Sequence, residues 1–282
     1  MTDRTLPLWL KIVLVVSASM QVIFGLRLLI DPSSLTSMWP WSMTPVTSRL
    51  LGASTLVSVP LAFLSVWFNR FSAACIPMIM ILCYRVLQLA AGFMHFARFD
   101  LTSPTTWNYF GGGGIMLIVL TIALIRGQSL GKAVYDYHPF LRGDSRLNIG
   151  SIGKIIFRAI SILFIALGVI FLLLGENANW LWFESAGNLT SLTARLFASP
   201  MVGLGIAAWI ISTASRWREV AIPAVGMCTF GMAGILTLLL ESASIQPPTL
   251  LGYIITLTPF ILLGMGIYLL MPSRATPVPS NR

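Results

Sequence analysis

Ionisable residues inside long apolar runs are the side chains of this sequence best suited to chemistry. Arg85 lies past the middle of the run from Phe71 to Phe96, where an arginine in a membrane helix costs roughly 2.5–3.5 kcal/mol. Such a side chain has to face a bundle interior, a watery cleft or a partner. Among the ionisable residues near the ends of their runs are Arg49, His95, Arg195 and Glu241.

Arginine is suited to anion recognition because it stays charged and can bind a carboxylate or phosphate through two parallel hydrogen bonds. We therefore expect an outward-facing polar pocket, formed by these five ionisable residues, that holds a small anionic or lipidic ligand. The alternative is architectural. In that case the arginines cap loops, or pair with carboxylates and carbonyls, and lock the helices together.

Most named sequence motifs of catalytic and cofactor sites are absent. The chain has no P-loop, no H-E-x-x-H and no C-x-x-C, so we expect no metal and no cofactor. A membrane enzyme acting on an outer-leaflet lipid, with His95 or Glu241 as acid–base, stays open as a second function. A non-catalytic subunit or scaffold is the third, with its protein partner unknown.

Composition sets the class of protein. The chain has 282 residues, of which 56% are hydrophobic and 10% charged, against about 25% charged in soluble domains. An integral membrane protein that is all α-helical is therefore expected. Eight apolar runs are long enough to span a bilayer: Pro7 to Ile30, Pro45 to Phe68, Phe71 to Phe96, Trp107 to Ile125, Ile155 to Leu174, Leu192 to Ala214, Val220 to Ala243 and Leu250 to Met271.

The formal charge of +9 is interpreted as membrane topology and not as a nucleic-acid surface. With eight spans, most basic residues fall in loops on one side, which the positive-inside rule places in the cytoplasm together with both termini. Residues 127–152 form the largest basic loop and could attract anionic lipid. We expect a bacterial cytoplasmic (inner) membrane, with membrane lipids as the surroundings.

An internal repeat is indicated by rare residue types that recur at one interval. Arg195 follows Arg49 by 146 residues, and Pro223 follows Pro77 by the same distance. The interval also relates His95 to Glu241, whereas Arg85 corresponds to Gly231. These matches predict two parallel four-helix repeats, residues 1–126 and 153–271, joined by the cytoplasmic linker 127–152 and followed by a disordered tail, 272–282.

Tryptophans precede the second span of each expected repeat. They are expected at headgroup level as interface anchors, at Trp39, Trp41, Trp180 and Trp182. The segment from Trp39 to Ala53 reads WPWSMTPVTSRLLGA. It resembles the WPW-x-LTPL-x-x-R-x-x-GA segment of a family of bacterial multi-span membrane proteins without an assigned function. The resemblance implies a membrane protein and supplies no catalytic residues.

Overall fold

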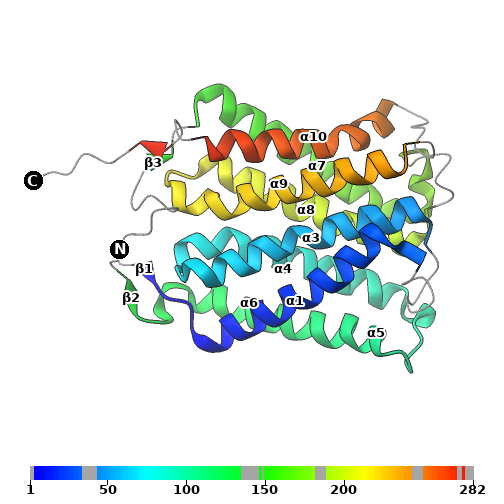
Figure 1. The fold of residues 1–282 in the computed structure, drawn as a ribbon, viewed down its shortest axis with the longest axis horizontal. Coiled ribbons are helices and arrows are strands. Elements are labelled where there is room, and N and C mark those ends of the chain that lie inside the picture. The colour runs from blue at the N-terminus through cyan, green and yellow to red at the C-terminus, as the bar shows by residue number, and fades with distance from the viewer. Residues whose placement is uncertain are drawn as a thin grey trace, which may run out of the picture.

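The computed structural model describes residues 3–33, 43–134, 146–147, 149–181, 189–242, 250–271 and 275–276. Within these ranges, eight helices are long and apolar enough to cross a membrane. This confirms the expected class, an all-α protein whose helices indicate an integral membrane protein. The helices lie alongside one another in one bundle (Figure 1).

The first four spans are α1 (Leu8–Ile30), α3 (Pro45–Phe68), α4 (Phe71–Met94) and α6 (Gly113–Arg126). The short helix α5 (Pro104–Trp107) and a π-helical turn, η2 (Asn108–Gly112), lead into α6. The other four spans are α7 (Ser151–Leu174), α8 (Ser191–Thr213), α9 (Trp217–Leu240) and α10 (Leu250–Leu270). The described residues also form three 3₁₀ turns: η1 (Phe96–Arg98), η3 (Gly127–Ser129) and η4 (Gly175–Leu181).

In the described part of the chain, four two-residue strands form two antiparallel pairs at one end of the bundle, which we call the strand end (Figure 1). β1 (Asp3–Arg4) pairs with β2 (Ala133–Val134), and β3 (Arg146–Leu147) pairs with β4 (Ala275–Thr276). β2 and β3 belong to the predicted linker 127–152, and β4 to the predicted tail 272–282. Most other residues of these two segments lie outside the described ranges. The opposite end of the bundle is called the far end.

Threonine side chains cap the N-termini of α3 and α8 in the same way. Thr44 Oγ1 accepts a hydrogen bond from the backbone N–H of Thr47 at the start of α3, and Thr190 Oγ1 accepts one from Thr193 at the start of α8. An N-cap side chain of this kind satisfies one of the free N–H groups of the first turn, which stabilises a helix by about 1 kcal/mol.

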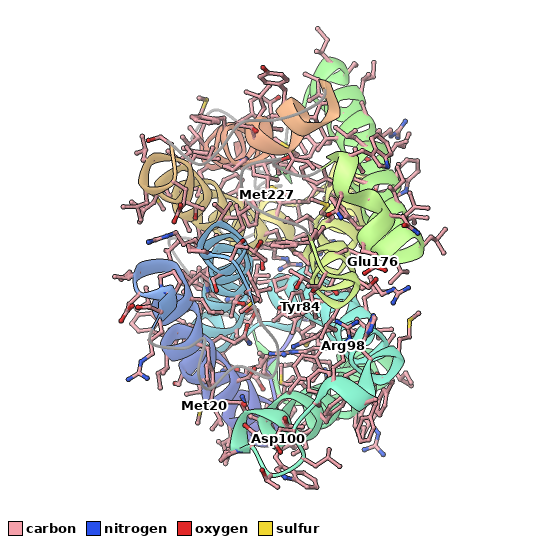
Figure 2. The ribbon with its side chains drawn as sticks, turned by 90° about the vertical axis from the view of Figure 1, so that its right-hand side faces the viewer. Met20, Tyr84, Arg98, Asp100, Glu176 and Met227 are labelled. Atoms are coloured by element: carbon pink, nitrogen blue, oxygen red, sulfur yellow. The ribbon has the colours of Figure 1, made fainter. Side chains whose placement is uncertain are left out.

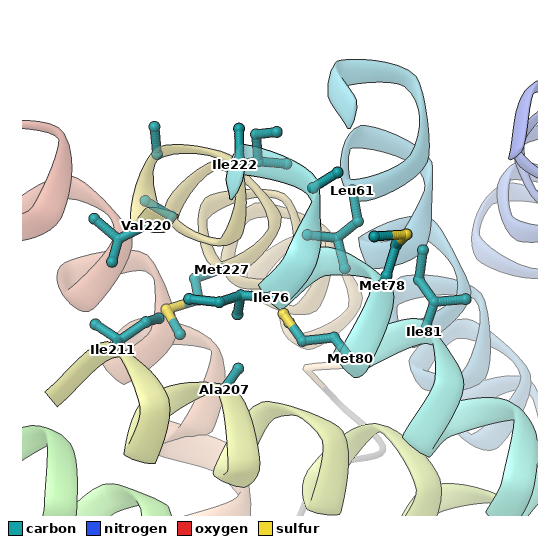
Figure 3. Packing of buried hydrophobic residues seen from close by; sticks show 14 of the residues in the cluster. Leu61, Ile76, Met78, Met80, Ile81, Ala207, Ile211, Val220, Ile222 and Met227 are labelled. Carbon is teal, nitrogen blue, oxygen red and sulfur yellow. The ribbon is translucent and has the colours of Figure 1, made fainter. Parts of the chain in front are cut away.

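The middle of the bundle is formed by α3, α4, α8 and α9. α3 packs against α9, and α4 packs against α8, while α1, α7, α10 and α6 cover α3, α8, α9 and α4 respectively. Apolar side chains from the four central helices meet in a closely packed core (Figure 3). Leu61, Met78, Ala207 and Met227 are at most 2% exposed. Because lipid is as apolar as these side chains, close packing is what holds such a bundle together.

Small residues allow the closest helix crossings. A Cβ added at Gly52 of α3 would lie 2.8 Å from the Gly25 carbonyl oxygen of α1. A Cβ added at Gly168 of α7 would lie 3.1 Å from the Ala198 carbonyl oxygen of α8. In both places a larger residue would force the backbones apart.

Candidate anion-binding cavity

A cavity of about 280 Å³ lies between α1, α3, α4 and the η2–α6 segment. Apolar side chains form much of the wall, among them Val16 and Met20 of α1 and Ile115 and Met116 of α6. Polar side chains also line the cavity, including Ser17, Gln21, Thr55, Tyr84, Gln88 and Asn108. Figure 2 views the bundle from the far end and shows Tyr84 near its middle and Met20 on α1 towards its edge. Both residues line the cavity.

Arg85 is the only charged residue among the described residues that line this cavity. It lies on α4, nine residues before the helix ends at Met94. At 1.5 Å per residue this places it roughly 13 Å from the far end of the helix. A positively charged side chain therefore lines the cavity at the depth of the membrane interior.

Neutral amides flank the Arg85 guanidinium. Nη1 donates a hydrogen bond to Gln88 Oε1 at 2.7 Å. With the Gln21 amide oxygen turned towards Arg85, Nη2 donates to it at 2.9 Å, and Gln21 Nε2 donates to Ser58 Oγ and to the Thr55 carbonyl oxygen. This orientation satisfies both ends of the Gln21 amide, which joins α1 to α3 and α4.

The Nε–H of Arg85 is buried and has no acceptor among the described residues. No described carboxylate lies within 4.0 Å of the guanidinium. The guanidinium also lies over the Tyr84 ring, 5.5 Å from its centroid. A buried charge without a partner of opposite charge is costly, and an anion in the cavity would remove that cost. Nε–H and the neighbouring Nη–H form an edge that can bind a carboxylate or phosphate through two hydrogen bonds.

The π-helical turn η2 forms the far-end part of the cavity wall. Asn108, Tyr109 and Gly112 of this turn line the cavity, and the Tyr109 hydroxyl donates to the Gln88 carbonyl oxygen at 2.5 Å. This bond holds the turn against α4, next to the Arg85 partner Gln88. π-Helical turns inside α-helices are frequent at functional sites.

The other four predicted site residues lie outside the cavity. Arg49 donates from Nε to Glu241 Oε1 at 2.7 Å and from Nη1 to the Leu29 carbonyl oxygen at 2.8 Å. The two side chains are only 16% and 12% exposed. Arg49 therefore caps the end of α1 and links α3 to the end of α9.

Arg195 makes the corresponding contacts on α8. It donates from Nε to the Leu172 carbonyl oxygen of α7 at 3.1 Å and from Nη1 to His95 Nε2 at 2.5 Å. Arg195 thus caps α7 and links α8 to the end of α4. Of the five residues predicted to form one pocket, the structure places Arg85 in the cavity and the others in these two far-end clusters.

His95 accepts from Arg195, so its Nε2 carries no proton. Burial lowers the pKa of His95, and the positive charges of Arg195 and Arg98 lower it further, while Glu176 raises it. The neutral imidazole is thus the favoured form near neutral pH. As a hydrogen-bond acceptor fixed between two helices, it contributes to the architecture of the far end.

Glycines stand 146 residues after two of the cavity residues, at a place where α10 packs closely on α9. Gly231 and Gly234 of α9 follow Arg85 and Gln88 by 146 residues. A Cβ at Gly231 would lie 2.5 Å from Leu263 Cβ and 2.7 Å from the Pro259 carbonyl oxygen, both on α10. α10 therefore packs directly on α9 where α6 leaves room for the cavity.

Gln21 and Gln88 were not among the residues predicted for the site. Their signal was available, because polar amides are rare inside apolar runs and Gln88 lies one turn from Arg85. The predicted anchors Trp39, Trp41 and Trp182 lie outside the described residues, and Trp180 is half-exposed in η4 at the far end. Within the described part, no group of three or more His, Cys, Asp or Glu residues could hold a metal ion.

Comparison of the chain with protein-family models, with curated proteins and with solved structures returns no match. The function therefore has to be argued from the cavity itself.

Proposed function

We propose that this chain is a membrane protein that binds or transports a small anionic or lipidic ligand, and that Arg85 holds the ligand's negative charge. The buried Nε–H of Arg85 carries this proposal, since it faces no acceptor among the described residues. The cavity that Arg85 lines supplies the room for an anion. The enzyme alternative has weaker support, because His95 and Glu241 each bind an arginine away from the cavity.

We further propose that residues 1–126 and 153–271 are two copies of a four-helix unit, related by an axis along the membrane normal. The far-end arginines support this. Arg49 of the first unit reaches Glu241 of the second, and Arg195 of the second reaches His95 of the first. The interval of 146 residues separates Arg49 from Arg195 and also His95 from Glu241. Exchanging the two units therefore turns the contact between Arg49 and Glu241 into the contact between Arg195 and His95.

In this arrangement the strand end is cytoplasmic. The basic residues that flank the spans at this end support the orientation, among them Arg70 and Arg216, which precede α4 and α9. We propose a bacterial inner membrane, with anionic lipid at the basic segment 127–152. The resemblance of the segment around Arg49 to bacterial multi-span proteins agrees with this location.

The test is anion-dependent stability of the purified protein in a non-ionic detergent. A ligand at one hundred times its Kd stabilises the folded state by about 2.7 kcal/mol. We expect at least one anion from a panel of acetate, inorganic phosphate and laurate to raise the thermal midpoint of the wild type. Arg85→Gln should lose this effect, while Arg49→Gln should keep it, because Arg49 is a membrane-end arginine outside the cavity. An anion effect that survives Arg85→Gln, or none with any anion, would overturn the proposal.

A further inference from the structure

Building on the proposed anion site, we infer that the ligand is a single-chain amphiphile ending in a carboxylate, a long-chain fatty acid. It reaches Arg85 sideways from the bilayer, through the gap between α1 and α6. Its carboxylate accepts a hydrogen bond from the Nε–H of Arg85, and its hydrocarbon chain lies along the apolar wall and extends into the lipid.

The charge of the cavity selects a single negative charge. Arg85 is the only charged group among the described lining residues, so one guanidinium is available to neutralise the ligand. A doubly charged phosphate monoester would bring one uncompensated charge into the membrane interior, which is strongly unfavourable. A carboxylate leaves the site neutral.

The shape of the cavity around Arg85 selects a terminal anionic group. Gln21, Thr55 and Tyr84 line the cavity beside the guanidinium, and Gln21 is itself held by Ser17, Ser58 and Thr55. A phosphodiester of a two-chain lipid carries substituents on both sides of its charge and would have to displace these groups. A carboxylate ends in its two oxygens and needs no room beyond them.

The two apolar helices α1 and α6 both line the cavity. Val16 of α1 and Ile115 of α6 are lining residues and are 54% and 57% exposed, and from this exposure we infer an opening between the two helices. In a membrane this opening faces lipid chains and not water, so it suits a hydrocarbon tail.

The depth of Arg85, roughly 13 Å from the far end of α4, agrees with this route. A fatty acid can enter the membrane interior in its neutral, protonated form. It gives up its proton beside the guanidinium, since a nearby positive charge favours the carboxylate. The proton returns to water, and the carboxylate supplies the acceptor that the Nε–H of Arg85 lacks.

The experiment measures equilibrium binding to the purified protein in dodecyl maltoside at pH 8. The ligands are palmitate, acetate as the head without the tail, hexadecanol as the tail without the charge, and hexadecyl phosphate as the doubly charged analogue. We expect palmitate to bind at least tenfold more tightly than the other three. Arg85→Gln should weaken palmitate binding at least tenfold, and Arg49→Gln should leave it unchanged.

The outcomes separate this inference from the proposed function. Acetate or hexadecyl phosphate binding as tightly as palmitate, and depending on Arg85, would overturn the fatty-acid assignment and leave the anion site standing. Palmitate and hexadecanol binding equally in the wild type and in Arg85→Gln would overturn both.

The lateral route is tested with a bulky residue at the opening. Val16→Trp should slow palmitate association at least tenfold, because the indole narrows the gap between α1 and α6. Ile23→Trp is the matched control, since Ile23 is also exposed on α1 but does not line the cavity. Equal association rates for the two variants would overturn the lateral route.

Discussion

The ion pair between Arg49 and Glu241 is expected to be a measurable stabilising contact between the two halves of the bundle. We predict that Glu241→Gln lowers the free energy of unfolding by about 1–2 kcal/mol. Hydrogen bonds to charged groups contribute about 1.5–3 kcal/mol, and the glutamine retains a neutral acceptor for Arg49. The pair is mostly buried, at 16% and 12% exposure, so it should exceed the 0–1 kcal/mol of exposed pairs.

The assay is reversible unfolding in mixed micelles of dodecyl maltoside and SDS, followed by tryptophan fluorescence. Glu176→Gln is the control, because Glu176 is an exposed carboxylate at the same end and should change stability by less than about 0.5 kcal/mol. The double variant with Arg49→Gln gives the coupling energy of the pair. A loss for Glu241→Gln no larger than that for Glu176→Gln would refute the account of this contact.

Three further predictions follow from the same structure. Gly231→Ala should lower the free energy of unfolding by about 1–3 kcal/mol, because the added Cβ would collide with α10. Gly114→Ala is the control, because an added Cβ there has nothing within 4 Å and should not destabilise the protein. Equal free energies of unfolding for the two variants would contradict the packing argument. His95 has a lowered pKa in the folded protein, so the unfolded chain takes up the proton first and the free energy of unfolding should fall as pH drops below about 6.5. His95→Gln should make the dependence of stability on pH flatter. The same dependence in wild type and variant would count against this role of His95. Reporter fusions after Lys132 should report cytoplasm and those after Asp100 the outside, and the reverse pattern would invert the topology.

The eight spans could be predicted from the sequence because each one depends on local composition. A run of about 20 apolar residues has to be helical in lipid, whatever its neighbours are. The contacts within the two far-end clusters were harder to predict from the sequence. The interval of 146 residues related His95 to Glu241, but the crossing of Arg49 to Glu241 and of Arg195 to His95 depends on which helices of the two halves lie side by side.

The site was predictable only at Arg85, because an arginine at that depth needs an explanation wherever its helix packs. Its cavity arises from helix packing that the sequence does not reveal. Near Arg85 the cavity lies between α4 and α6, whereas α10 packs directly against Gly231 of α9. The contribution of Gln21 depends on α1 lying against α3 and α4, a tertiary contact that no pattern in the run from Pro7 to Ile30 specifies.

The central claim is that Arg85 binds an anion that is not part of the protein, and the most direct measurement is an experimental structure of the protein purified in lipid nanodiscs from its own membrane. We predict a non-protein group within hydrogen-bonding distance, about 3 Å, of Arg85 Nε, with an apolar tail leading out between α1 and α6. A carboxylate side chain of the protein bound to Arg85 Nε, or α6 closed against α4 with no cavity, would contradict the claim.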